Sequence, residues 1–233
     1  MNPPPAFTGF PQEGLAFFKE LAENNNKLWF DEHRGDYEHQ ILDPARDFIV
    51  ALGDRLRTIA PGIQADPRVN KTLFRINRDT RFRHDKTPYK THLALWFWEG
   101  PRPRMECSGF YFHLEPAKLL LGTGLYCFPQ DMVEPYRQSV VHPREGKALT
   151  LALSKVKGKG DYQIGGQHLK KIPFGYDPKH PLAEFLLFNG LHAAVDWTIP
   201  AEVFSAGLVD FCFGHFRNML PLHRWLLALT QRV

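Results

Sequence analysis

The stretch SGFYFHLEPAKLLLGTGLYCF (residues 108–128) holds two apolar runs, 108–114 and 118–128, joined around Glu115–Pro116. Runs of this length, rich in aromatic and branched residues and separated by a short turn, are typical of a β-hairpin. Gly122 and Gly124 lie inside the second run and predict a bulge or close packing against another backbone. The stretch therefore places antiparallel strands at the centre of the chain.

Two further strands are predicted on the N-terminal side of this hairpin. In VNKTLFRIN (69–77) Thr72, Phe74 and Ile76 alternate with Leu73, Arg75 and Asn77, as in a half-buried strand. THLALWFW (91–98) is the second strand. Alternation puts Trp96 and Trp98 on one of its faces and Phe97 on the other, so core packing explains most of these aromatics.

Helical periodicity precedes the strands. Residues 11–23 repeat apolar side chains at helical spacing, and three asparagines at 24–26 end the pattern. KLWFDEHR (27–34) begins a second helical region that is interrupted at Gly35 and continues with a 3.6-residue period to Ile59. Pro44 breaks or restarts this helix, since proline removes a donor and crowds the preceding turn.

Helical patterns also follow the strands. They begin at Gln130, recur in a short helix at 182–187, and end in a pair, 202–220 and 222–229, separated by Pro221. GKGDYQIGG (158–166) is predicted to be a loop. The order predicts one α+β domain over residues 1–233, with a mostly antiparallel central sheet flanked by N-terminal and C-terminal helices. Residues 1–6 are predicted to be a disordered tail.

Composition limits the class of protein. The 233 residues are 43% hydrophobic and 23% charged, which is ordinary globular composition. Three cysteines, Cys107, Cys127 and Cys212, are far apart and form no CxxC pair, so reduced thiols are expected. No secretory signal begins the sequence, and no apolar run is long enough to span a bilayer. We therefore expect a cytoplasmic protein that does not enter membranes.

The charge of the chain is concentrated in one segment. RINRDTRFRHDKTPYK (75–90) carries six arginines and lysines and two aspartates, whereas the other 217 residues carry 23 groups of each sign. The formal net charge of +4 therefore belongs to sixteen residues. Such a distribution differs from the broad basic field of a general nucleic-acid coat.

At this segment the sequence resembles a bacterial family known as domain of unknown function 2461. The family pattern R-x-x-R-D-x-R-F followed by D/N-K-x-x-Y falls on Arg75, Arg78, Asp79, Arg81, Phe82, Asp85, Lys86 and Tyr89. FTGF (7–10), ENNNKLWF (23–30), LLLGTGLY (119–126) and PFGYDPKHP (173–181) are similar to family stretches in the same order. The chain departs from the pattern at Arg83 and His84, which add charge, and at Asn189, where members tend to carry lysine. The resemblance implies a site rather than a chemistry.

The segment predicts an anion-binding site. Guanidinium groups match phosphate or carboxylate oxygens in two-point contacts, and ammonium groups add compact charge. We expect a phosphate-bearing ligand, a nucleotide or another phosphoester, to bind Arg75, Arg78, Arg81, Lys86, Tyr89 and Lys90. Asp79 and Asp85 are the candidate catalytic residues, able to orient an arginine, hold a metal that arrives with the ligand, or act as a base. His84 and His92 are expected to titrate near neutral pH.

Two alternatives stay open. In the first, the segment is a binding module without turnover, for nucleic acid or a protein partner. In the second, its arginines and aspartates neutralise one another around an irregular crossover and only stabilise the fold. Hydrolysis or group transfer, the cofactor and the oligomeric state are not decided by the sequence.

Other motifs in the sequence give weaker evidence for a functional site. Eleven histidines occur without HExxH or a Cys/His pairing, so no metal site is expected, and His215 and His223 are interpreted as ordinary helix or loop residues. The glycines at 122–124 lack the GxGxxG pattern of dinucleotide sites, and the 158–166 stretch lacks the P-loop pattern. Ser108 lies in CSGF rather than in GxSxG, so it predicts no nucleophile elbow.

Overall fold

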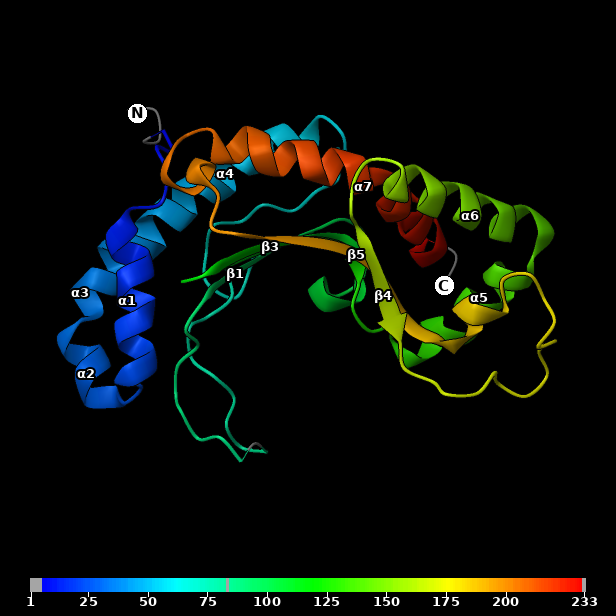
Figure 1. Cartoon of the computed structure of the whole chain (residues 1–233), viewed down its shortest axis with the longest axis horizontal. Helices are drawn as coiled ribbons and strands as arrows, with labels where there is room; N and C mark the ends of the chain where they lie inside the picture. The colour runs from blue at the N-terminus through cyan, green and yellow to red at the C-terminus, as the bar shows by residue number, and fades with distance from the viewer. Residues whose placement is uncertain (1–5, 83, 232–233) are drawn as a thin grey trace. The chain divides into compact units, whose positions relative to one another are not determined.

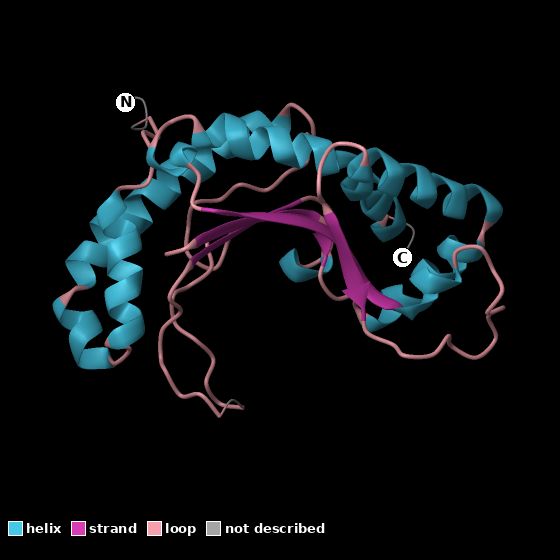
Figure 2. Cartoon of the chain, viewed as in Figure 1, coloured by secondary structure: helices cyan, strands magenta, loops and turns pink. Residues whose placement is uncertain are grey.

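The computed structural model describes residues 6–82 and 84–231, so residues 1–5 of the predicted tail and Arg83 lie outside the described part. Helices precede and follow a five-stranded antiparallel sheet, which confirms the α+β class (Figure 2). The strand order is β1-β2-β3-β5-β4. The strands are β1 (Leu93–Trp98), β2 (Gly109–Glu115), β3 (Lys118–Leu125), β4 (Gln163–Gln167) and β5 (Phe188–Thr198).

The N-terminal helices follow the predicted pattern closely. Helix α1 ends at an asparagine, and the side chain of Asn26 caps α2 by accepting a hydrogen bond from Trp29 N at 3.0 Å. Pro44 restarts the helix: it lies in the first turn of α4, where its missing N–H is not needed, directly after one π-helical turn. The helices are α1 (Gln12–Glu23), α2 (Lys27–Glu32), α3 (Arg34–Tyr37), the π-turn (Glu38–Leu42) and α4 (Asp43–Arg57). Gly35 lies inside α3, so the predicted interruption there is wrong; the break falls at His33.

The central hairpin is confirmed as β2 and β3, with a two-residue turn at 116–117. Gly124 in β3 adopts a φ of +130°, and a Cβ atom there would lie 2.3 Å from the carbonyl oxygen of Leu191 in β5. A side chain would therefore push the two strands apart, which is the close backbone approach predicted for this position.

The strand predicted at 69–77 is wrong. Asn70 adopts a φ of +67°, which starts a turn, and after it only one bridge pairs the segment with β1, at Leu73 and Leu95. Ile76 and Asn77 then pair with a returning arm of their own segment instead of with the sheet. The alternation of buried Ile76 with exposed Asn77 survives without a continuous ladder.

Two strands near the C-terminus were not predicted. The loop expected at 158–166 is wrong from Gln163 on, because β4 forms there and pairs antiparallel with β5. Gly166 permits this pairing: its φ is +123°, and a Cβ would lie 2.0 Å from the carbonyl oxygen of Gly190. Strand β5 alternates weakly between buried and half-buried residues, which is why its pattern gave no clear signal.

The predicted break at Pro221 is also wrong, because α7 (Leu208–Thr230) is one continuous helix with the proline inside it. Proline removes one backbone hydrogen bond, but the buried side chains of Leu220, Leu222 and Leu226 hold both halves in place. The remaining helical elements are α5 (Gln130–Val141), α6 (Pro143–Lys157) and the 3₁₀ turns Arg104–Glu106, Ala183–Leu187 and Ala201–Phe204.

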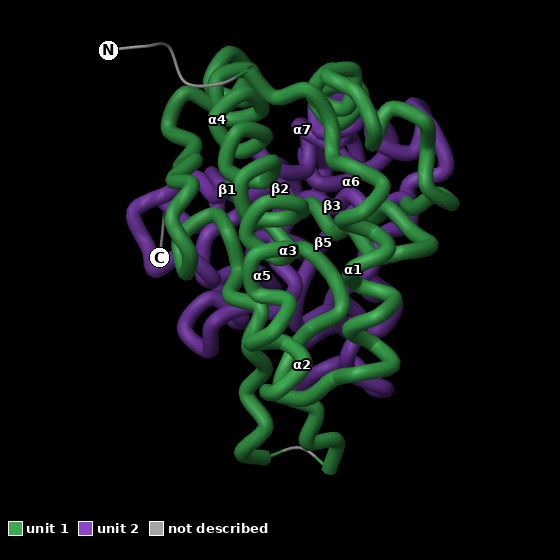
Figure 3. The backbone as a smooth tube through the Cα atoms, turned by 90° about the vertical axis from the view of Figure 1, so that its left-hand side faces the viewer, with its two compact units in different colours: residues 1–97, 111–120, 196–214 green, residues 98–110, 121–195, 215–233 purple. Residues whose placement is uncertain are grey.

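The chain divides into two compact units, shown in Figure 3. Unit 1 comprises residues 1–97, 111–120 and 196–214, and its core contains Phe10, Phe48 and Phe112 with ring centroids 5.0–6.1 Å apart. Unit 2 comprises residues 98–110, 121–195 and 215–233, and Phe110 and Phe216 pack in its core. Each unit is assembled from three segments, and the single domain over residues 1–233 stays a prediction.

Within the described residues, no helix has both the length and the apolar character required to cross a bilayer.

Candidate functional site

The charged segment forms an irregular hairpin, residues Arg75–His92, here called the basic hairpin. Its two arms run side by side in unit 1, without regular strand structure (Figure 1). Asn77 pairs with Tyr89, Arg78 N donates to Pro88 O at 2.8 Å, and Lys90 N donates to Ile76 O at 2.8 Å. These bonds fix the base of the hairpin.

The loop after α1 anchors the base of the basic hairpin. The side-chain amide of Asn25 donates to Tyr89 O and accepts from Tyr89 N, both at 3.0 Å, as a neighbouring strand would. The ring of Tyr89 stacks on Phe30 of α2 at 4.1 Å between centroids. The second arm is thus held by hydrogen bonds and by a buried aromatic contact, and Tyr89 acts mainly as its anchor.

A pocket of about 700 Å³ lies against this base. Ligand pockets for small molecules commonly enclose about 300–1,000 Å³. Its lining comes from the basic hairpin and the C-terminal end of α1 with the loop after it. The lining residues are Ala22, Asn25, Arg75, Asn77, Arg78, Asp79, Asp85, Thr87, Tyr89, Lys90, Thr91 and His92.

Arg78 and Asp85 form the ion pair that closes the two arms over the pocket. Arg78 Nη1 donates to Asp85 Oδ2 at 2.5 Å and also to the hydroxyl of Thr87. The second carboxylate oxygen of Asp85 accepts from Thr87 N at 2.9 Å and from the Thr87 hydroxyl at 2.8 Å. Sequence reasoning did not select Thr87, although it completes this network.

Arg81 and Lys86 are held nearer the tip and do not line the pocket. Arg81 binds Asp79 through its side chain, at 3.0 Å from Nε and 2.7 Å from Nη2, and through its backbone N–H. Lys86 Nζ donates to the carbonyl oxygen of Thr80 at 2.9 Å. Of the six predicted ligand-binding residues, the pocket therefore brings together Arg75, Arg78, Tyr89 and Lys90.

Arg75 and Lys90 both bring positive charge to the pocket lining. Lys90 Nζ donates to the backbone carbonyl of Arg75 at 2.8 Å, which holds its ammonium group at the pocket. Among the described residues, the Arg75 guanidinium makes no hydrogen bond or ion pair, although its charge acts on Asp79. Its planar fork is exposed at the pocket wall.

Both candidate catalytic aspartates are strongly acidic. The hydrogen bonds from Arg81 hold the pKa of Asp79 far below its usual range, and the N–H of Thr87 with Arg78 lowers the pKa of Asp85 to about 2. A carboxylate this acidic is a weak base at neutral pH. Among the roles considered for these residues, the contacts favour orienting the arginines.

His92 lies at the end of the second arm and lines the pocket. Its ring stacks on His113 of β2, with centroids 4.2 Å apart and planes inclined by 30°. Burial, His113, Lys90 and Arg78 together lower the pKa of His92 to about 4, so the expected titration near neutral pH is wrong for this residue. The cations of the basic hairpin and the position of His113 on β2 together lower the pKa of His92. The spacing of residues in the sequence could not reveal the contribution of His113.

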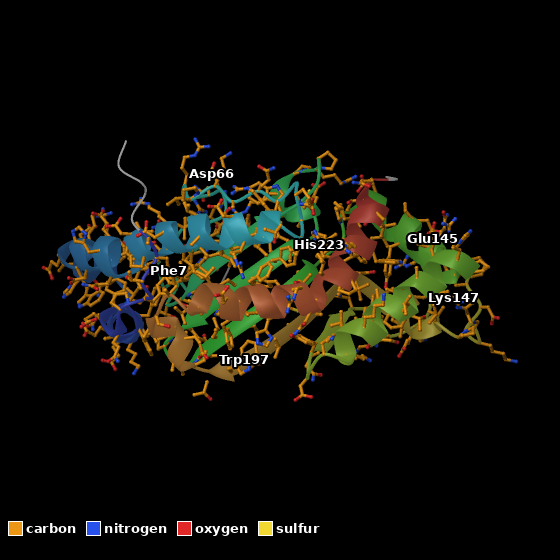
Figure 4. All side chains as sticks on the ribbon, turned by 90° about the horizontal axis from the view of Figure 1, so that it is seen from above. Phe7, Asp66, Glu145, Lys147, Trp197 and His223 are labelled. Atoms are coloured by element: carbon orange, nitrogen blue, oxygen red, sulfur yellow. The ribbon has the colours of Figure 1, made fainter. Side chains whose placement is uncertain are left out.

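Unit 2 contains a second polar cluster that sequence reasoning did not find. His223 on α7, labelled in Figure 4, has its Nδ1 3.0 Å from Ser108 Oγ and its Nε2 2.9 Å from Glu99 Oε2. The order of groups is that of a serine–histidine–acid triad. Ser108 and His223 are both fully buried, so a substrate has no access to the hydroxyl. The cluster is therefore a buried hydrogen-bond network that joins α7 to the chain around Glu99 and Ser108.

Comparison with protein families identifies the chain. A model of the family described as conserved hypothetical protein DUF2461 matches residues 13–225. The chain belongs to this family. A search of curated proteins finds no match.

The DUF2461 match covers the basic hairpin and continues through both compact units. Asn189, where the resemblance led us to expect a lysine, lies in unit 2 and accepts a hydrogen bond from Arg137 Nη2 at 3.2 Å. It is not among the pocket-lining residues, so the pocket does not depend on that position. Within the described part of the chain, no group of three or more histidine, cysteine, aspartate or glutamate side chains is arranged to hold a metal ion.

Proposed function

We propose that the chain binds a small anionic ligand carrying a phosphate group, such as a nucleotide or another phosphoester, at the base of the basic hairpin. The observation that carries the proposal is the exposed guanidinium fork of Arg75, which makes no ion pair within the described residues, in the lining of a pocket of about 700 Å³ that Lys90 also lines. A planar fork and a point charge together match two oxygens of a phosphate group.

The balance of charge supports a compact ligand. Three cations line the pocket, Arg75, Arg78 and Lys90, against the carboxylates of Asp79 and Asp85. Because Arg78 is already engaged by Asp85, Arg75 is the arginine that offers its guanidinium to a ligand, and Lys90 adds an ammonium group to the same lining. A long polyanion needs many phosphate contacts, so nucleic acid fits this arrangement less well than a small molecule.

The proposal also includes a cellular compartment and the type of reaction that the site could carry out. The scattered, unpaired cysteines support a reducing compartment, the cytoplasm. If the ligand is turned over, the reaction expected is hydrolysis or transfer of the phosphate group. Asp79 or Asp85 would then have to accept a proton despite their acidity, and the proposal therefore rests on binding and not on turnover.

Isothermal titration of the full chain with inorganic phosphate and with pyrophosphate tests the proposal. Loss of one charge-assisted, two-point contact removes about 1.5–3 kcal/mol, so Arg75→Ala should weaken binding about 10- to 100-fold. Arg57→Ala is the matched control, because it removes an exposed arginine of α4 that does not line the pocket. Equal affinities for wild type and Arg75→Ala would contradict the proposed site.

Salt dependence separates the small ligand from nucleic acid. A compact pocket that contacts one phosphate group predicts a shallow loss of affinity with salt. Binding of single-stranded DNA that falls steeply between 50 and 200 mM salt, by roughly a thousandfold or more, would favour the nucleic-acid alternative. The titrations with phosphate are repeated at both salt concentrations for this comparison.

A further inference from the structure

Among the pocket-lining residues, His92 carries an imidazole, a group that can both donate and accept a hydrogen bond. Among the described residues, neither ring nitrogen of His92 has a hydrogen-bond partner, and the ring contact that it makes is the stack on His113. Asn25, Thr87 and Arg78, by contrast, are engaged by the hairpin itself. An anion in the pocket therefore finds an imidazole free to donate or accept a hydrogen bond.

The groups that face His92 disfavour a proton on it while the pocket is empty. Lys90 and Arg78 act on it from the basic hairpin and His113 from β2, and burial adds to their effect. Behind it, His113 Nδ1 lies 3.0 Å from the Tyr111 hydroxyl and Nε2 lies 3.7 Å from Glu115 Oε2, with Lys118 also nearby. Asp79 and Asp85 line the same pocket but are bound by Arg81 and Arg78. The imidazole of His92 is therefore neutral at neutral pH.

We propose that His92 takes up a proton from solvent when a tetrahedral dianion binds, so that the pocket holds a phosphomonoester or inorganic phosphate as a dianion together with one proton. The inference rests on the proposed function and names the ligand class for the same site. The protonated ring nitrogen donates a hydrogen bond to a ligand oxygen, and no covalent bond is made or broken.

The physical reason for the proton uptake is the negative charge that the ligand brings to the pocket. Two negative charges placed in the pocket attract an imidazolium and oppose the repulsion that Lys90 and Arg78 exert on it, so a bound dianion favours the protonated ring. A phosphodiester brings a single negative charge, which attracts the imidazolium more weakly and leaves more of that repulsion in place. The site therefore selects the dianionic monoester over the diester.

The ring of His113 supports one face of His92, and the contact of 3.0 Å between His113 Nδ1 and the Tyr111 hydroxyl oxygen holds that supporting ring. His113 does not line the pocket, so it is not expected to touch the ligand.

Titration calorimetry with sulfate is the first test, because sulfate keeps two charges across the whole pH range used and contributes no proton of its own. The full chain is titrated at pH 6.5 in two buffers of different ionisation enthalpy, and the difference in heat gives the number of protons taken up. We expect roughly 0.5–1 proton per sulfate. The affinity should also rise by up to about tenfold for each unit fall in pH between 7.5 and 5.5.

Variants assign the proton to His92. His92→Gln should bind sulfate about tenfold more weakly at pH 6, with proton uptake near zero and an affinity nearly independent of pH. His39→Gln is the control, because His39 is an exposed histidine that does not line the pocket. Proton uptake that persists unchanged in His92→Gln would overturn the inference, and so would binding by wild type without any uptake.

A second measurement does not depend on a variant. With ¹³C-labelled histidine, adding sulfate to wild type at pH 6.5 should shift one imidazole resonance to the position of an imidazolium. Methyl phosphate should produce the same shift, whereas dimethyl phosphate should bind at least about tenfold more weakly. Dimethyl phosphate binding as tightly as methyl phosphate would refute the selectivity. Absence of binding by sulfate, phosphate and methyl phosphate alike would instead contradict the proposed function, and the inference with it.

Discussion

Replacing Arg78 with alanine measures how much stability the ion pairs of the basic hairpin contribute. The Arg78 side chain is 20% exposed and its partner Asp85 is 58% exposed. Breaking a buried ion pair costs about 3–5 kcal/mol, whereas an exposed pair contributes about 0.2–1 kcal/mol. With one partner shielded and the other in solvent, we expect Arg78→Ala to cost about 1–2 kcal/mol, including the lost hydrogen bond to Thr87.

Thermal unfolding converts this cost into a measurable shift. For a chain of this length, each kcal/mol lowers Tm by about 2–4 °C, so Arg78→Ala should melt about 2–8 °C below wild type. The melts are followed by circular dichroism at pH 7 in low salt, without ligand. Arg78→Lys should recover little of the loss, because an ammonium group cannot reproduce the planar fork.

Arg81→Ala is the matched control for this experiment. Its pair with Asp79 is open to solvent, since the Arg81 side chain is 76% exposed, and its removal should lower Tm by less than the removal of Arg78. A fall in Tm as large for Arg81→Ala as for Arg78→Ala would refute the reasoning from exposure. An unchanged or raised Tm for Arg78→Ala would show that Arg78 is held among like charges at a cost to stability.

Three further outcomes are expected. His223→Leu should lower stability by about 2–4 kcal/mol in thermal melts, because it removes two buried hydrogen bonds, and Ser108→Ala should cost about half as much. Gly124→Ala should cost more than about 2 kcal/mol in the same assay, because its Cβ would meet the β5 backbone at a φ of +130°; a neutral result would contradict the close approach. The folded-state pKa of His92, about 4, lies below the unfolded value of about 6.5, so the unfolded chain binds more protons between these values and stability falls as pH drops through that window. Discounted for solvent screening of the partly exposed ring, His92 contributes about 1–2 kcal/mol to that loss, and His92→Gln should flatten the pH profile of denaturant unfolding by this amount.

The fold could be predicted where one local signal dominated. The paired apolar runs around Glu115–Pro116 gave the central hairpin, and Gly124 gave the close backbone approach. Prediction from the sequence failed where a single backbone angle, or packing between side chains on separate turns, decided the structure. A left-handed Asn70 turned the chain out of the strand pattern, and buried leucines on both sides carried α7 through Pro221.

The candidate site also has features that the sequence predicts and features that it does not. Charge density located the basic hairpin and four residues at its pocket, because the sequence directly shows where charges are concentrated. The sequence indicates only a helix stop at Asn25, whose side chain binds both backbone groups of Tyr89 from 64 residues away. The stack of His92 on His113 depends on how the hairpin meets β2, and no spacing rule reports that contact.

The structural and the ligand-binding interpretations of the basic hairpin apply to different residues of the same motif. Asp85 and Asp79 pair with Arg78 and Arg81, which builds the hairpin, while Lys90 and Arg75 bring charge to the pocket, and Arg75 makes no ion pair within the described residues. The division makes a joint prediction: Arg78→Ala should change Tm, and Arg75→Ala should change the affinity for phosphate with little change in Tm. If the roles are separate, the losses of unfolding free energy measured for the two single variants should add in the double variant, and so should their losses of binding free energy, each within about 0.5 kcal/mol. A coupling energy larger than about 1 kcal/mol would mean that the ion pairs and the pocket cations form one network, in which the ligand completes the structure of the hairpin.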